Sequence, residues 1–361
     1  MPSQTEQYMT EQWALKGKRA TDIKDTCEAF NKEHKHTGVS EAVRQMALMG
    51  GKLRSNISRD WKKRLAKWER PGFTSVRTKI FDIKARPFAK ETFSDLQIIA
   101  PDDYLQWMYT KHRSRFDACV LGNLGPGQIR EYWSNISRED SVCKLYDING
   151  MLDDEISLCL PLCSCGDAVP VANVSGLSLK CTSVRSMFGV GKAVDLHMLL
   201  FCVSSKLCVS NKPRGCLTTR PLYQSVAHRL LSLSTGEHPT HGDCGQLLEY
   251  DELEVAGGFR FLHIRTAGDM DHLSNELELA HGSSHNPCSK CKCRLHGDWN
   301  TFSAGNSWMC TVYTGEAWTP PNHPLFQHFP GGSTAGPTFV ALDFTHISDK
   351  GFGPRMIVGS I

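Results

Sequence analysis

The sequence predicts an α/β fold: a mixed sheet preceded by a helical N-terminal region and interrupted by a Cys-rich insertion. Three observations predict it. Short apolar runs typical of strands recur from residue 156 onward. A segment with apolar residues at helical spacing separates the third run from the fourth. Before residue 150 the chain is mostly helix-like and rich in Lys and Arg. We therefore expect two regions, 1–150 and 151–361.

Composition narrows the class of protein. The chain has 361 residues, of which 40% are hydrophobic and 22% charged, as in ordinary globular proteins. A net charge of +3 is weak evidence for a nucleic-acid partner. The start is polar and no apolar run could span a bilayer, so we expect no secretory or membrane segment and a nuclear or cytoplasmic location. In such a reducing compartment, most of the 15 Cys should be buried thiols and a few metal ligands.

The N-terminal region carries an amphipathic, basic segment. Ile57, Trp61, Leu65 and Trp68 recur at helical spacing on one face. The basic residues between them include a candidate nucleic-acid-binding set: Arg59, Lys62, Lys63 and Lys67. Contact with a phosphate backbone is one interpretation. A solvated face on a core-packing helix is the other, and charge runs favour it.

The remaining elements follow from apolar patterning. We expect strands at 156–165, 177–184, 198–203, 258–264 and 338–342. Helices are expected at 128–133, 221–233 and 273–279. Pro161 suggests an edge strand or an irregular start for the first strand. The unbroken apolar run 198–203 instead predicts a central strand.

Two aspartates follow strand-like runs. Asp167 comes after the first strand and Asp269 after the fourth. Carboxylates at the ends of adjacent strands can bind Mg²⁺ or Mn²⁺, and such cations promote phosphoryl transfer. Asp is also common in turns and helix caps, which is the plainer interpretation. The order alone leaves both interpretations standing.

A cluster of cysteines follows the second aspartate. Cys288 and Cys291 have the two-residue gap that lets both thiolates bind one Zn²⁺. His296 and Cys310 complete a tetrahedral set, for which Cys293 is a rival ligand. A closed four-ligand site would be structural. The alternative is a set of unliganded thiols, because this chain uses Cys freely.

Other polar residues are weaker candidates. Asp343 and His346 could bind metal or each other, and such a pair is more often structural. His238, His241 and Asp243 could also be ligands, although their context is typical of a polar loop. A metal hydrolase of another kind would need one of these histidines to meet an Asp.

Taken in order, these motifs resemble the catalytic domain of eukaryotic DDE transposases, and most closely the CACTA group with its Plavaka- and Zisupton-like relatives. The matching residues are Asp167, Asp269, Cys288 with Cys291, and Asp343 with His346. The resemblance covers about 156–353. It implies a ribonuclease-H-like fold, catalytic Asp167 and Asp269 with Mg²⁺ or Mn²⁺, DNA as a partner, and compatibility with a homo-oligomer.

The sequence also departs from that family. Ala168 stands where Gly often follows the first Asp, and residues 347–351 are more polar than usual. No Glu follows Asp343, so the third acidic ligand is missing from its expected place. We therefore expect a truncated or decayed copy, or an early-ending gene model, without strand-transfer activity. The alternative is a zinc-stabilised nucleic-acid- or protein-binding module without catalytic function.

Overall fold

The computed structural model describes residues 28, 73–82, 90–136, 138, 140–170, 178–210, 215–280 and 318–342. The chain divides into two compact units, Met1–Arg70 and Pro71–Ile361. Within the first unit only Glu28 is described, in a helical conformation. All elements discussed below belong to the second unit, whose core includes residues on both sides of residue 150.

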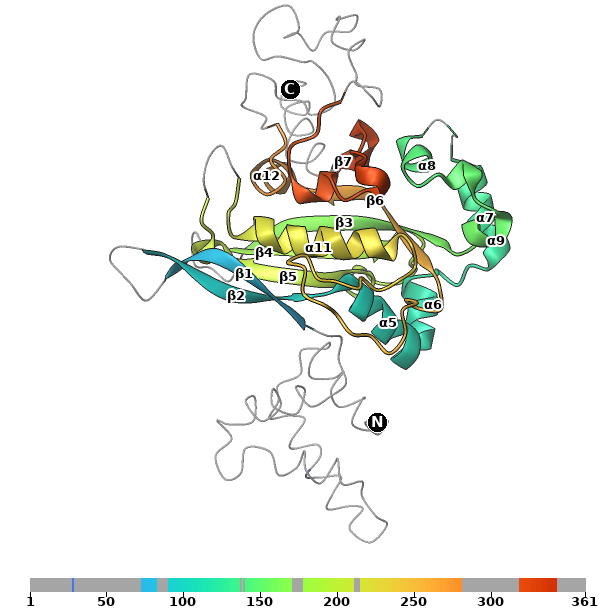
Figure 1. Cartoon of the computed structure of the whole chain (residues 1–361), viewed down its shortest axis with the longest axis horizontal. Coiled ribbons are helices and arrows are strands. Elements are labelled where there is room, and N and C mark those ends of the chain that lie inside the picture. The colour runs from blue at the N-terminus through green and yellow to red at the C-terminus, as the bar shows by residue number, and fades with distance from the viewer. Residues whose placement is uncertain are drawn as a thin grey trace, which may run out of the picture. The chain divides into compact units, whose positions relative to one another are not determined.

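A five-stranded mixed sheet forms the centre of the second unit (Figure 1). Its strands, in the order β5-β4-β3-β6-β7, are Met198–Ser204, Ser178–Ser186, Cys159–Pro170, Arg260–Gly268 and Val340–Leu342. The strands β3, β4 and β5 form an antiparallel meander, whereas β6 and β7 are added parallel to β3 and β6 respectively. The predicted α/β class with a mixed sheet is confirmed.

Helix α11 (Thr219–Leu233) lies across one face of this sheet (Figure 1). Its buried residues include Leu222, Tyr223, Val226 and Leu230, which follow the helical spacing. Along β4, every second residue from Thr182 is buried, and the Thr182 hydroxyl lies 2.8 Å from the Tyr223 hydroxyl. The even-numbered positions of β4 therefore face α11. The odd-numbered positions define what we call the outer face of the sheet.

A two-stranded antiparallel hairpin, β1 (Phe73–Asp82) and β2 (Lys90–Ile99), precedes the helices. The sequence predicted a mixed, mostly helical pattern there, because β2 is largely exposed and lacks an apolar alternation. The other α-helices are α5 (Pro101–Lys111), α6 (Arg113–Cys119), α7 (Pro126–Ser134), α8 (Ser141–Leu145), α9 (Asp153–Ile156), α10 (Ala193–Leu196) and α12 (Met270–Asn275).

The helices before β3 belong to the same core as the sheet. The indole nitrogen of Trp133 donates to the Cys159 carbonyl at 2.9 Å, and the Tyr146 hydroxyl donates to the His263 carbonyl at 3.0 Å. Phe116 packs edge-on against Phe261 of β6. These contacts join α6, α7 and the segment after α8 to the two central parallel strands.

Short 3-10 helices complete the described chain: Ile148–Gly150, Ser205–Leu207, Pro324–Phe326, Pro330–Gly332 and Pro337–Phe339. Phe326, Phe329 and Phe339 are fully buried, and their rings contact one another edge-on. The sequence predicted a loop or insertion at 323–332. The structure instead shows that this Pro- and Gly-rich stretch contributes to the core.

Two strand placements differ from expectation. Pro161 lies in β3, the middle strand of the sheet, and not in an edge strand. It is tolerated because the ladder to β4 begins only at Leu162, so no bond to β4 requires an N–H at residue 161. Conversely, β5 is an edge strand and not a central one, and its Leu199 and Cys202 are exposed.

Candidate functional site: two Gly-Asp strand ends and a buried Asp-His-Arg group

The central parallel strands end in the same two-residue sequence. Gly166 of β3 pairs with Gly268 of β6, and each glycine is followed by an aspartate, Asp167 and Asp269. Neighbouring strands lie about 4.8 Å apart. The parallel register therefore puts two aspartates that are far apart in sequence at adjacent positions of one sheet.

The two glycines are required by a histidine that covers them. A Cβ atom on Gly166 would lie 1.8 Å from Cε1 of His272, and one on Gly268 would lie 2.5 Å from its Cδ2. Gly166 also pairs with Thr182 of β4, so His272 approaches from the side of the sheet that faces α11. Any larger residue at either position would displace the imidazole.

Burial lowers the pKa of the His272 imidazole, while the negative charges of Glu276, Asp269 and Asp167 act in the opposite direction. Both aspartates are thus close enough to influence the same ring. The imidazole is neutral where its pKa is lowered, so it supplies no positive charge to the carboxylates.

The carboxylates themselves make local hydrogen bonds. Asp269 caps helix α12, where its Oδ1 accepts from the backbone N–H of His272 at 2.7 Å. Oδ1 of Asp167 accepts from the backbone N–H of Ala168 at 2.7 Å. Asp167 is exposed and Asp269 is half-buried, and neither forms an ion pair with another described residue. Both therefore keep oxygen lone pairs free of any described cation.

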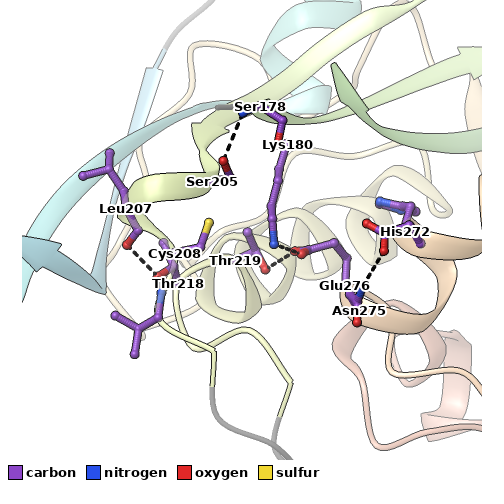
Figure 2. Close-up of polar contacts among 12 residues, drawn as sticks. Ser178, Lys180, Ser205, Leu207, Cys208, Thr218, Thr219, His272, Asn275 and Glu276 are labelled. Atoms are coloured by element: carbon purple, nitrogen blue, oxygen red, sulfur yellow. Dashed lines mark hydrogen bonds and ion pairs between the residues drawn. The ribbon is translucent and has the colours of Figure 1, made fainter. Parts of the chain in front are cut away.

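A buried ion pair fixes α12 beneath these aspartates (Figure 2). Lys180 of β4 donates to Oε1 of Glu276, and the Thr219 hydroxyl of α11 donates to Oε2 at 2.7 Å. Figure 2 shows the Lys180 side chain extending from its strand to meet Glu276, with His272 on the neighbouring part of the same helical segment. Both Glu276 oxygens are occupied, so this residue positions α12 and leaves cation binding to the aspartates.

A second acidic group lies in the same unit. Asp102, Asp103 and His238 are close enough together to hold a metal ion, whose identity the structure does not specify. Asp102 and Asp103 belong to the first turn of α5. Oδ2 of Asp102 lies 2.7 Å from Nη1 of Arg229 and 2.8 Å from Nδ1 of His238. The group therefore links α5 to α11 and to the segment after it.

Charge in this group is largely balanced by protein. Although burial opposes ionisation of Asp102, the hydrogen bond from His238 and the positive charge of Arg229 leave its pKa lowered. Burial and the Asp102 charge raise the pKa of Asp103 to about 6. Oδ1 of Asp102 is buried without a described partner. A metal ion could use that oxygen, but it would compete with the guanidinium already bound to Oδ2.

The sequence did not identify Asp102 or Asp103 as candidates. Pro101, Asp102 and Asp103 are typical of a helix start, where acidic residues are common, so the local pattern carries no specific signal. His238 was considered a loop residue, yet it is buried and stacks on Tyr250 with ring centroids 4.0 Å apart. His241, by contrast, is exposed.

The other predicted site residues lie outside the described residues. They are the proposed zinc ligands Cys288, Cys291, His296 and Cys310, the family motif Asp343 and His346, and the basic residues Arg59, Lys62, Lys63 and Lys67. Zinc binding and nucleic-acid binding by these residues stay predictions.

Comparison with protein-family models, with curated proteins and with solved structures gave no match for this chain. Among the described helices, none combines the length and the apolar character needed to cross a membrane. The function must therefore be argued from the geometry of the two acidic groups.

Proposed function

We propose that this chain is a transposable-element-derived protein related to DDE DNA transposases, and that its sheet is a ribonuclease-H-like domain. In this proposal, Asp167 and Asp269 hold a divalent cation, Mg²⁺ or Mn²⁺. The observation that carries the proposal is the parallel pairing of Gly166 with Gly268, which makes the two following aspartates neighbours.

The strand order supports the same proposal. Counting from β3, the sheet has three antiparallel strands, then α11, then two strands added in parallel on the other side of β3. The first aspartate follows the first of these strands and the second follows the fourth. This is the order that the resemblance to DDE transposases implies for its two catalytic aspartates.

The chemistry of the pair suits a hard cation. Mg²⁺ prefers carboxylate oxygen, and it usually binds through one or two carboxylates together with water and substrate phosphates. Within the described part of the chain, no third His, Cys, Asp or Glu joins Asp167 and Asp269 at ligand distance. Two-metal phosphoryl transfer needs a fuller ligand set. We therefore propose cation binding by this pair without strand-transfer activity.

Binding of Mn²⁺ to the full chain, measured by isothermal titration calorimetry, tests the cation site. The double variant Asp167→Asn, Asp269→Asn should weaken binding at least ~10-fold, because both anionic ligands become neutral. Asp271→Asn is the matched control, since Asp271 is exposed, lies two residues from Asp269 and already accepts from Asn275 at 2.6 Å. An equal loss in this control would contradict the proposal.

Asp103→Asn provides a further arm. If Mn²⁺ binding disappears in this variant and survives in the double variant, the cation occupies the Asp102 group instead. A Mg²⁺-dependent DNA nicking assay should show no product from the unaltered chain. Robust nicking that is abolished by Asp167→Ala would overturn the inactive part of the proposal. Stoichiometric zinc without any Mn²⁺ binding would favour the zinc-stabilised binding module.

A further inference from the structure

Two cysteines face each other across neighbouring strands of the sheet. Cys181 of β4 pairs directly with Cys202 of β5, and their sulfur atoms are 3.1 Å apart. Cys202 is exposed and Cys181 is half-buried. Both occupy the outer face, because Cys181 alternates with the buried Thr182 along β4. The two thiols are thus adjacent and accessible to a small reagent.

Their backbone spacing also suits a covalent link. Directly opposed residues in an antiparallel ladder have Cα atoms about 4.5 or about 5.5 Å apart, depending on the position in the hydrogen-bond pattern. A disulfide requires a Cα separation of about 4.4–6.8 Å. Either cross-strand spacing satisfies this requirement, so a bond between the two sulfur atoms requires no rearrangement of the strands.

We propose that Cys181 and Cys202 form a modification site at which a small disulfide, such as oxidised glutathione, produces a reversible cross-strand disulfide. The exposed Cys202 thiolate attacks the small disulfide and releases one equivalent of thiol. The Cys181 sulfur then attacks the Cys202 sulfur of the mixed disulfide and releases the second equivalent. The protein thiols lose two electrons and two protons, and the small disulfide gains them.

The other described cysteines explain why this pair is singled out. Cys163 and Cys165 have sulfur atoms 4.0 Å apart, but they lie two positions apart on one strand, about 6.6 Å between Cα atoms and near the limit for a disulfide. Cys208 and Cys216 contact each other but are buried. Cys244 is exposed and has no sulfur contact with another described cysteine. Only Cys181 with Cys202 combines contact, cross-strand spacing and access among these residues.

The site is next to the proposed cation site but does not depend on it. Cys181 pairs with Asp167 on its other side, so Asp167, Cys181 and Cys202 form one row across three strands. Loss of cation binding would leave the two thiols where they are. The two proposals can therefore fail separately.

Peptide mapping of the full chain after equilibration with reduced and oxidised glutathione tests the inference. Trypsin separates the two cysteines, because it cuts after Lys180, Arg185, Lys192 and Lys206. Alkylation of the free thiols, followed by mass spectrometry, should find a linked pair of peptides, 181–185 with 193–206. Its yield should exceed that of a Cys163–Cys165 disulfide by at least ~10-fold, and dithiothreitol should reverse it. Cys244 should carry glutathione instead.

Two variants and an unfolded control make the test decisive. Cys181→Ser should stop the reaction at a glutathione adduct on Cys202, and Cys202→Ser should abolish the linked peptide. Urea-unfolded chain should lose the preference for this pair, because the pairing comes from the fold. Separate glutathione adducts on both cysteines, linkage of either to a third cysteine, or an equal yield in urea would each overturn the inference.

Discussion

The two acidic groups of this protein differ in how their charge is balanced. Asp102 is completely buried, and one of its oxygens contacts Arg229, His238 and Tyr250. Asp167 and Asp269 lie at strand ends, more exposed, and neither is bound to a described cationic side chain. The Asp102 group uses cations of the protein itself, whereas the strand-end pair leaves its charge available to a cation from solution.

This difference separates an acidic group that stabilises the fold from one that can bind a ligand. Burying a carboxylate costs several kcal/mol unless a partner compensates it, so a buried group such as Asp102 must keep its partners. A carboxylate that keeps access to water needs no such partner. The predictions below test whether the two groups divide along this line.

Neutralising Asp102 should have the largest effect. In Asp102→Asn, the buried Arg229 would lose its counter-charge, and breaking a buried ion pair in this way costs about 3–5 kcal/mol. Asp167→Asn is the matched comparison and should change the free energy of unfolding by less than about 0.5 kcal/mol, because the residue is exposed. Urea unfolding followed by circular dichroism measures both. Equal losses would show that the division is wrong.

The strand-end pair should instead be sensitive to packing. Gly166→Ala would force its Cβ into the His272 ring, at a cost of up to about 3 kcal/mol for an overpacked site. The same substitution in a His272→Ala background should cost at least ~1 kcal/mol less, because the obstructing ring is gone. A double-mutant cycle of unfolding free energies gives this coupling. Strict additivity would mean that His272 does not impose the glycine.

Acid should act on histidines before it reaches Asp102. Burial lowers the pKa of His328 to about 4, from an ordinary value of 6.5. Above pH 6.5 both the folded and unfolded forms are neutral. Below it the unfolded form takes up a proton first, so stability falls between pH 6.5 and about 4, by about 2 kcal/mol at pH 5. Because the pKa of Asp102 is lowered from 3.8, its contribution is lost only at still lower pH.

Unfolding free energies of His328→Gln at pH 7 and pH 5 check this window. The variant should lose about 2 kcal/mol less than the unaltered chain between the two pH values, because it no longer titrates. The exposed His241→Gln is the control and should follow the unaltered chain. Asp102→Asn should also keep the full loss above pH 4. If it abolished that loss, the acid response would belong to the Asp102 group.

The sequence predicted the strands of the sheet better than their arrangement. Local apolar runs identified β3 to β7 because each strand has at least one buried face. Their order depends on contacts between distant residues, so β5 was wrongly expected to be central and β3 to be irregular or at an edge. The repeated Gly-Asp at the ends of β3 and β6 was the one local hint of their parallel pairing.

The acidic groups were predictable to different degrees. Asp167 and Asp269 could be named from sequence because each follows a strand. The role of His272 could not, since it depends on α12 folding back over two glycines. The Asp102 group joins residues separated by more than 120 positions, such as Asp102 and Arg229, and each has an ordinary local context. Such a group becomes visible only in three dimensions.

The smallest predicted effect distinguishes the two roles of Asp269. Its Oδ1 caps α12, and an Asn side chain can make the same hydrogen bond without the negative charge. Asp269→Asn should therefore leave the free energy of unfolding nearly unchanged, whereas Asp269→Ala should lower it by about 1 kcal/mol. Both variants should bind Mn²⁺ less tightly than the unaltered chain. If Asp269→Asn were instead as destabilising as Asp102→Asn, Asp269 would have to be counterbalanced by a protein cation, and the contrast between the two acidic groups would disappear.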